Sequence, residues 1–352
     1  MPFLFSNYPP CRTDYQKFID TFYDLLSEAD EMNIAVGYIT ADSLSELQNI
    51  VEMNNVNKLN LTIGMHYFDL FTAVEYNAAM RLNNFLQKNR IGGVNLITSF
   101  RFHGKMYSYS KNNKPIAGIL GSNNLSSIVE SNNRVYEASI LLRDSQNALD
   151  MYKFIEHLNK TSAQNIANLK IETFKQANHL LEHYDGVEKI SDETVNNIKS
   201  NITKTTFEIP IKGEDEGAGK SNLNVCFGEG RKDKRGLVKP RHWYEVELIV
   251  PKILTSGAGY PQSGTKGACF DVITDDGWKF KCKVSGDCSK NFRSDNDLKI
   301  LGRWLKGRLE NAGVLEVGKT VTSETLQKYG RSTFTLTKTN IENLWFLDFG
   351  VK

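Results

Sequence analysis

The chain has 352 residues, of which 40% are hydrophobic and 24% are charged, an ordinary globular mixture whose length favours two domains. Its formal net charge is only +2, so the overall charge does not identify a protein that binds nucleic acid. No apolar run approaches the ~18 residues that a membrane-spanning helix needs, and the N-terminal residues lack the pattern of a signal peptide. We therefore expect a cytoplasmic protein with no membrane partner.

The first half of the chain alternates between helix and strand. Apolar spacing and turn residues predict its elements in chain order. They are helix 15–31, strand 33–40, helix 41–51, strand 59–65, helix 73–88, strand 94–98, a hairpin of strands 102–110 and 116–120, strand 135–142 and helix 149–158. Ser43 and Glu46 have the spacing of a capping box for the second helix. This rhythm predicts an α/β fold with a partly parallel sheet.

The second half has a different pattern. Residues 159–200 are polar and permit helix, so we interpret them as a helical linker. Short apolar runs and glycine-rich loops follow, interrupted by one amphipathic helix. The expected elements are strands 206–211, 244–250, 269–273 and 278–284, helix 298–311, and then residues 321–327, 334–338 and 344–349, which return to the strand pattern. This order predicts a mainly β barrel with one or two helices.

Positive charge is concentrated in the second half. Residues 231–252 contain seven Lys or Arg against three Asp or Glu, and residues 276–308 contain nine against four. The same segments carry Trp243, Trp278, Phe292 and Trp304. A local excess of cations is what contacts with nucleic-acid phosphates require. A solvated basic surface is the alternative, and charge by itself does not decide between the two.

The most informative residues lie between positions 103 and 137. His103 and Lys105 are two apart on a predicted strand, so their side chains point to one face of the sheet. Ser122 and Asn124 follow the next strand in a glycine-led turn, and Glu137 falls on the strand after that. An imidazole can attack a phosphodiester, a lysine and an amide can bind phosphoryl oxygens, and a carboxylate can hold the other imidazole nitrogen. Because no acidic cluster indicates Mg²⁺ and no Cys-x-x-Cys pair indicates zinc, the set indicates a metal-independent phosphodiesterase.

These residues resemble a known signature. His-Gly-Lys at 103–105 and Gly-Ser-Asn-Asn at 121–124 are similar to the His-x-Lys and Gly-Ser-x-Asn motifs of the phospholipase D superfamily. The match places Ser122 and Asn124 on the signature Ser and Asn, and Glu137 on the downstream acid.

Two features of the match narrow its meaning. The superfamily signature has an Asp five residues after the Lys, and Ser110 stands there in this chain, which points away from lipid hydrolysis and toward the nuclease branch. Superfamily members use two histidines, whereas this chain has one such motif. The resemblance therefore implies a homodimer, formed through the N-terminal domain, in which two copies of His103 meet in one pocket.

The second half carries a further resemblance. Residues 300–309 (ILGRWLKGRL), with Gly313 and the Val-Gly-Lys run at 317–319, resemble the pseudobarrel DNA-binding domain shared by plant B-three transcription factors and some restriction enzymes. A phospholipase D-like domain followed by such a barrel is similar to the BfiI-like restriction endonucleases, the NgoFVII family. The resemblance implies an α/β phospholipase D-like catalytic domain in residues 1–165, a helical linker in 166–200, and a mainly β, B-three-like DNA-recognition domain in 201–352.

The implied function is a metal-independent, sequence-specific Type II restriction endonuclease that needs no cofactor. It would hydrolyse the phosphodiesters of double-stranded DNA through a covalent phosphohistidine-type intermediate at an active site shared by the two subunits. The implied catalytic residues are His103, Lys105, Ser122, Asn124 and Glu137. Such an enzyme requires a DNA methyltransferase in the same host to protect host DNA.

Barrels of this kind are expected to grip the major groove with two loop arms, one after strand 206–211 and one after strand 278–284. The expected DNA-binding residues are Asn222, Asn224, Arg231, Lys232, Lys234 and Arg235 in the first arm, and Ser289, Lys290, Asn291, Arg293, Ser294 and Asn296 in the second. Arginine pairs with guanine edges and asparagine with adenine, whereas lysine more often contacts phosphates. These loops therefore have the chemistry of base readout, and solvated loop charges are the alternative.

Two other functions fit parts of the sequence. A catalytically inactive DNA-binding regulator would keep the barrel, but the His, Lys, Asn and Glu set of the first half is intact. A phospholipase D-type lipid enzyme would leave the basic second half without a role. Incubation with duplex DNA in excess EDTA distinguishes the three functions.

Overall fold

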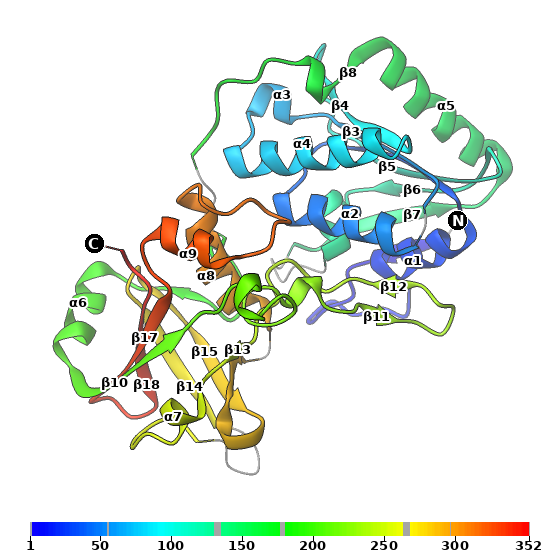
Figure 1. Ribbon diagram of the computed structural model, residues 1–352. Coiled ribbons are helices and arrows are strands. Elements are labelled where there is room, and N and C mark those ends of the chain that lie inside the picture. The colour runs from blue at the N-terminus through cyan, green and yellow to red at the C-terminus, as the bar shows by residue number, and fades with distance from the viewer. Residues whose placement is uncertain are drawn as a thin grey trace. The chain divides into compact units, whose positions relative to one another are not determined.

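Each half of the chain is built around its own mixed β-sheet (Figure 1). The computed structural model describes residues 2–54, 56–129, 135–176, 180–262, 268–295 and 297–351. The chain divides into two units, Met1–Asn178 with Gly230–Pro240, and His179–Glu229 with Arg241–Lys352. The segment Gly230–Pro240 therefore belongs to the first unit, although the sequence on both sides of it belongs to the second.

The first unit contains an eight-stranded sheet with the strand order β1-β7-β6-β5-β2-β3-β4-β8. Strands β2, β3 and β4 are parallel to one another and the other neighbours are antiparallel, which confirms the partly parallel α/β fold. The elements are β1 (Phe3–Phe5), α1 (Phe18–Glu28), β2 (Glu31–Val36), α2 (Ala41–Asn54), β3 (Lys58–Ile63), α3 (His66–Asp69), α4 (Ala73–Lys88), β4 (Gly92–Ile97), β5 (Lys105–Lys111), β6 (Lys114–Gly121), η1 (Leu125–Val129), β7 (Ala138–Leu142), α5 (Ser145–Ser162), β8 (Ala163–Asn165), η2 (Ile166–Asn168), β11 (Arg231–Lys232) and β12 (Val238–Lys239).

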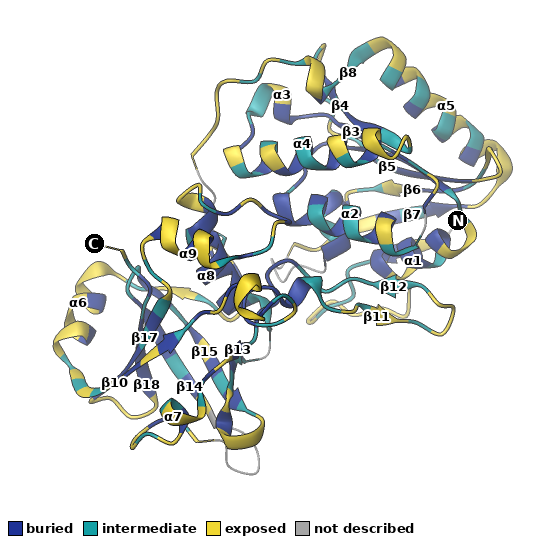
Figure 2. Cartoon of the chain, viewed as in Figure 1, coloured by how far each residue is buried: buried dark blue, intermediate teal, exposed yellow. Residues whose placement is uncertain are grey.

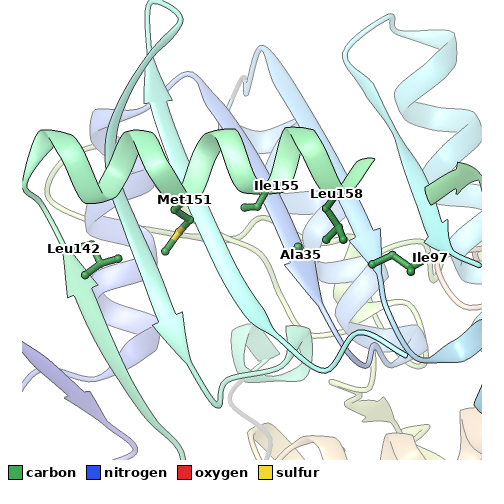
Figure 3. Close-up of a cluster of buried hydrophobic side chains, with 6 residues drawn as sticks. All are labelled: Ala35, Ile97, Leu142, Met151, Ile155 and Leu158. Carbon is green, nitrogen blue, oxygen red and sulfur yellow. The ribbon is translucent and has the colours of Figure 1, made fainter. Parts of the chain in front are cut away.

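Helices cover both faces of this sheet because its strands carry apolar side chains on both sides. Ile155 of α5 is fully buried in a cluster with Ala35 of β2 (Figure 3). Met106 of β5 also packs against this cluster. The next residue of β5, Tyr107, points to the opposite face and contacts Phe22 of α1 edge to face. Burial of one such side chain contributes about 1.5–3 kcal/mol. The strands are accordingly buried, while α5 turns exposed residues outward (Figure 2).

Two strands begin later than the sequence predicts. β5 starts at Lys105 and β7 starts at Ala138, so His103 and Glu137 precede their strands and do not lie on them. Both residues are therefore in strand-end segments, where side chains of neighbouring strands can meet.

The predicted capping box of Ser43 and Glu46 is wrong. Helix α2 begins at Ala41, and the residue before it, Thr40, takes the capping position. The Thr40 hydroxyl accepts a hydrogen bond from the Ser43 N–H at 3.4 Å, and the Ser43 hydroxyl accepts one from the Thr40 N–H at 3.1 Å. The reciprocal pair is thus formed one turn earlier than expected.

The second unit contains a curled sheet in the strand order β10-β17-β18-β14-β15-β16-β13, with β9 paired to β15. Only β14 and β18 are parallel among the strand pairs described, so the mainly β, half-barrel architecture is confirmed. The elements are β9 (Glu188–Lys189), α6 (Asp192–Ser200), β10 (Ile202–Pro210), η3 (Glu214–Glu216), η4 (Val225–Phe227), β13 (Leu248–Ile249), α7 (Lys252–Thr255), β14 (Ala268–Thr274), β15 (Trp278–Ser285), η5 (Asp287–Ser289), β16 (Asn291–Ser294), α8 (Lys299–Asn311), α9 (Ser323–Tyr329), β17 (Thr333–Thr339) and β18 (Leu344–Asp348).

Residues 159–200 do not form the helical linker that the sequence predicts. Helix α5 ends at Ser162, and β8 then pairs with β4 in the first sheet. Strand β9 pairs with β15 of the second sheet, and Val195 and Ile198 of α6 are buried against Ile273. Because the region is polar, its sequence did not reveal the short strands β8 and β9 and the helix α6, which belong to the two units.

Two expectations for the second half were also wrong in detail. Residues 321–327 do not return to the strand pattern, because most of them form α9. The Thr322 side chain accepts a hydrogen bond from the Thr325 N–H, and Gly330 ends the helix in a left-handed conformation, with φ at 92°. Of the strand predicted at 244–250, only Leu248–Ile249 pairs as a strand.

Several cations of the second unit lie in its interior. Lys306 of α8 is 0% exposed, and its Nζ donates to the main-chain oxygen of Trp243 at 2.6 Å and lies 3.5 Å from the centre of the Trp243 ring. Burial lowers the pKa of Lys306. Arg308 donates two hydrogen bonds to the Asp275 carboxylate, at 2.6 and 2.8 Å. Lys306 and Arg308 therefore contribute to the basic excess of residues 276–308 but are engaged within the unit. Across the described residues, every helix is too short or too polar to span a bilayer.

Candidate active site

Lys105 is the first residue of β5 and lies opposite Val36, the last residue of β2. Its side chain is buried, and its Nζ donates a hydrogen bond to the main-chain oxygen of His103 at 2.6 Å. Burial lowers the pKa of Lys105, and the nearby carboxylate of Glu137 opposes that shift. His103 itself is exposed. The imidazole is therefore accessible to a substrate, and the lysine is anchored to the same residue.

Two glycines let the chain pass close to His103. A Cβ atom at Gly37 would lie 3.3 Å from Cδ2 of the His103 imidazole. A Cβ atom at Gly64 would lie 2.0 Å from the carbonyl oxygen of Phe102, whose N–H donates to the Gly64 oxygen at 3.1 Å. A side chain at Gly64 would have to push the main chain beside His103 out of place. The residues that follow β2 and β3 therefore fix the segment that precedes β5.

The turn after β6 carries the next part of the site. The Asn124 side-chain oxygen accepts a hydrogen bond from the main-chain N–H of Tyr38 at 3.0 Å. Because a main-chain N–H can only donate, this contact directs the Asn124 oxygen to Tyr38 and leaves its NH₂ group to point elsewhere. Asn123 is buried, and its oxygen accepts from the Ser139 hydroxyl at 2.5 Å. Asn123 thus fixes the turn, while Asn124 is bonded to the main chain of Tyr38.

Ser122 and Glu137 form a pair at the edge of this site. The Ser122 hydroxyl donates to the Glu137 carboxylate and accepts from the Ala138 N–H at 3.0 Å. Together with the influence of Glu137 on Lys105, this pair places all five predicted catalytic residues in one region. The expectation that Glu137 holds the imidazole is not met within one chain. Among the described residues, its carboxylate is bonded to Ser122 and not to His103.

Tyr38 and Asp69 also belong to this region, although the sequence did not predict either residue. The Tyr38 ring meets the His103 imidazole edge to face, with centroids 5.7 Å apart and planes at 77°. Its hydroxyl donates to Asp69 at 2.7 Å, and Asp69 also accepts from Nε of Arg101 at 3.2 Å. The hydrogen bond between them raises the pKa of Tyr38 and lowers the pKa of Asp69. No local motif marks either residue, and the available signal is that Tyr38 follows a strand ending near the site.

Two residues expected to read DNA from the first arm are buried in the second unit. Asn222 and Asn224 are 2% and 0% exposed. The Asn224 NH₂ group donates to the main-chain oxygens of Ala218, at 3.1 Å, and Val321, at 2.9 Å. Its oxygen accepts from the Val321 N–H at 2.8 Å. Asn224 is therefore a structural residue whose polar atoms are already used, and it does not present an edge to a base.

The four basic residues of the first arm belong to the first unit. They are Arg231, Lys232, Lys234 and Arg235, all exposed in and around the β11–β12 hairpin. Arg235 pairs with Asp24 of α1 at 2.6 Å and with Asp233 at 3.1 Å. The main chain of Val238 exchanges two hydrogen bonds with the Asn54 side chain, at 2.8 and 3.0 Å. The hairpin is thus fastened to the first unit, whereas the sequence predicts that it is an arm of the barrel.

The second arm retains three accessible candidates. They are Lys290, which is exposed, and Asn291 and Arg293, which are half-buried. Ser289 and Ser294 are buried, at 2% and 1% exposed, and Asn296 lies outside the described residues. Arg293 lies 3.8 Å from Glu247 and forms a partly exposed ion pair with it.

Two family models match the chain in the order of its two units. The NgoFVII restriction endonuclease N-terminal PLD domain matches residues 15–171, and the NgoFVII C-terminal B3-like DNA-binding domain matches residues 197–340. Fold, site and matches together define a phospholipase D-like nuclease joined to a DNA-binding domain. The two matched ranges cover most of the chain, which belongs to the NgoFVII restriction endonuclease family.

Solved structures with partial similarity include NucT from Helicobacter pylori, which is 14% identical with a TM-score of 0.30, over 42% of this chain and 89% of that chain. Phosphatidylserine synthase from Haemophilus influenzae Rd KW20 is 15% identical with a TM-score of 0.34, over 48% of this chain and 41% of that chain. Neither likeness is close enough to bear on function. None of the curated proteins compared with this chain matches it.

The burial of Asn224 predicts a stability effect. Asn224→Ala leaves the Val321 N–H without its partner and removes one of the two hydrogen bonds that the Ala218 and Val321 carbonyl oxygens each accept. The free energy of unfolding of the second unit should therefore fall by about 1–3 kcal/mol. All four tryptophans lie in the second unit, so urea unfolding followed by tryptophan fluorescence reports on that unit alone. Lys290→Ala, at an exposed position, is the matched control and should unfold like the wild type. Unchanged unfolding of Asn224→Ala, combined with weaker DNA binding, would contradict a structural role.

Proposed function

We propose that the chain is a sequence-specific Type II restriction endonuclease that cuts duplex DNA without a metal ion, through a covalent phosphohistidine on His103. The supporting observation is the arrangement of His103, Lys105 and Asn124 near the end of β2. The imidazole is exposed and lies against the Tyr38 ring, the buried Lys105 donates to the His103 main chain, and the Asn124 oxygen is bonded to the Tyr38 N–H. The family membership supplies the class of substrate.

The chemistry follows from these side chains. A ring nitrogen of His103 attacks phosphorus, and the N–P bond forms as the P–O bond to the leaving sugar oxygen breaks. A second histidine protonates that oxygen. Water then attacks phosphorus and passes a proton to the second histidine, which lost one in the first step. The N–P bond breaks, which leaves a terminal phosphate and free imidazole. Lys105 and the Asn124 NH₂ group donate to the phosphoryl oxygens as their negative charge grows.

The donors around the site support a reaction carried by the protein's own groups. Lys105 supplies a fixed positive charge, and burial in a low-dielectric environment strengthens its attraction to a phosphate. Two copies of the chain would supply two such lysines.

Cleavage in chelator tests this function. We expect the protein to cut duplex DNA into discrete fragments in excess EDTA, because Lys105 and Asn124 replace the metal. His103→Ala should lose cleavage and keep DNA affinity, because the second unit holds the DNA. Lys105→Ala should lose about 10²-fold or more of the rate. Gel electrophoresis measures the fragments and their ends give the recognised sequence. Cleavage only with added Mg²⁺, or wild-type cutting by His103→Ala, would contradict the mechanism.

The second histidine is proposed to come from another copy of the chain, because this sequence has one His-x-Lys motif. A homodimer through the first unit then forms one active site from two subunits.

Subunit mixing tests the shared site. If each dimer needs both copies of His103, mixing equal amounts of wild type and His103→Ala after subunit exchange should leave about one quarter of the dimers active. Independent sites would instead leave about half of the sites active. Cleavage rates measure the active fraction, and light scattering confirms the dimer. An active monomer at working concentration would sink the proposal.

Base reading is proposed for the accessible residues of the second arm. Arg293→Ala should weaken binding to the cognate site by about 1–3 kcal/mol and relax preference at one base pair, because arginine recognises a guanine edge. Lys290→Ala should weaken binding to cognate and scrambled duplexes alike and reduce the salt dependence, because lysine contacts phosphates. Binding titrations on both duplexes separate the two effects. Equal losses on both duplexes for Arg293→Ala would remove it from base reading.

Two further parts of the proposal concern the cell. A restriction enzyme destroys unprotected host DNA, so the function requires a DNA methyltransferase with the same specificity in the same host. The substrate is intracellular DNA, which places the reaction in the cytoplasm. The first part is tested by expressing the protein alone and asking whether host DNA is fragmented.

A further inference from the structure

Tyr38 touches two members of the proposed catalytic set through two different groups. Its ring meets the His103 imidazole edge to face, at 5.7 Å between centroids. Its main-chain N–H donates to the Asn124 side-chain oxygen at 3.0 Å. His103 and Asn124 therefore both contact Tyr38, although His103 precedes β5 and Asn124 follows β6.

The Tyr38 side chain is itself fixed at its far end. Its hydroxyl donates to one carboxylate oxygen of Asp69 at 2.7 Å, and Nε of Arg101 donates to the other at 3.2 Å. The Arg101 guanidinium also lies over the Phe68 ring, 5.2 Å from its centre. Since Arg101 is two residues before His103, one carboxylate ties the Tyr38 ring to the segment that carries the nucleophile.

The main chain at Tyr38 is held from a third side. His66 is 2% exposed, and its Nε2 accepts a hydrogen bond from the N–H of Ile39 at 3.2 Å. The His66 ring stacks on Phe71, with centroids 4.6 Å apart, and meets Tyr38 edge to face at 5.6 Å. The turn after β2 is thus supported by buried aromatic side chains, and a ring in it has little freedom to move.

We propose that Tyr38, braced by Asp69, is a positioning residue that aligns the His103 imidazole and the Asn124 amide for attack on phosphorus. The proposal rests on the proposed function, because it assigns a role relative to His103 as nucleophile. An imidazole must present its attacking nitrogen in line with the leaving oxygen, and the neighbouring ring edge limits rotation of the imidazole. The carboxylate acts at a distance from the substrate, by holding the tyrosine.

The test separates the ring, the hydroxyl and the charge of this arrangement. Tyr38→Leu removes ring and hydroxyl, Tyr38→Phe removes the hydroxyl alone, and Asp69→Asn keeps an acceptor for the hydroxyl but removes the charge that faces Arg101. Tyr67→Leu is the matched control, because Tyr67 is an exposed tyrosine of α3, the short helix that contains Asp69. Each full-length variant is measured for single-turnover DNA cleavage at saturating enzyme, and for Kd on the same duplex in a His103→Ala background.

A positioning role predicts a loss of rate without a loss of affinity. We expect Tyr38→Leu to lower the single-turnover rate by about 10²-fold, the effect of a misplaced reacting group, with little change in Kd. Tyr38→Phe and Asp69→Asn should each lose less, about 10-fold, because the ring remains. Tyr67→Leu should cleave like the wild type. Circular dichroism melting measures whether each variant is folded. Titration on DNA measures the active fraction, and the rates are corrected for that fraction.

Three results would overturn the inference. Tyr38→Leu could cleave at the wild-type rate while His103→Ala is inactive, which removes the role of Tyr38 and leaves the proposed function standing. The loss could lie wholly in Kd or in the active fraction, which would make Tyr38 a merely structural residue. A wild-type protein that leaves DNA intact under all conditions overturns the proposed function, and this inference with it.

Discussion

The antiparallel register of β2 and β5, which sets Val36 opposite Lys105, is the constraint on which the site depends. Because of it, the residues that leave β2 lie beside the residues that enter β5, and Tyr38 reaches His103. A shift of one residue would turn Lys105 to the other face of the sheet, where Met106 and Ala35 pack with Ile155 of α5. The register is held by burial of both faces, so the core that stabilises the sheet also sets the geometry of the catalytic groups.

Charged residues of one type have different tasks in this chain, and their surroundings decide which. Lys306 is buried and bonded to the main chain, whereas Lys290 is exposed. Arg235 lies in a basic run that resembles a DNA-binding arm, yet it is paired with Asp24 in the first unit. The first unit therefore includes basic residues of the Gly230–Pro240 segment, which lies in the second half of the sequence. A count of cations along the sequence overstates the number that can meet phosphates.

Much of the fold was determined by local sequence. The helix predicted at residues 73–88 matches α4, because its apolar spacing is regular and Thr72 with Glu75 caps its start. The parallel strands of the first unit were predicted from the strand–helix–strand rhythm. Residues 321–327 were not, because the helix α9 is short and depends on Thr322 and Gly330 at its ends more than on its apolar pattern.

The sequence by itself determined the order of the two domains and the five candidate catalytic residues, because those residues form a motif of short spacing at strand ends. Only the tertiary structure decided that Tyr38 and Asp69, 31 positions apart, join the site, that Asn224 is buried, and that the hairpin at Gly230–Pro240 belongs to the first unit. The physical reason is that a motif records neighbours along the chain. Burial and hydrogen-bond partners depend on which distant segments pack together, and no local pattern specifies that choice.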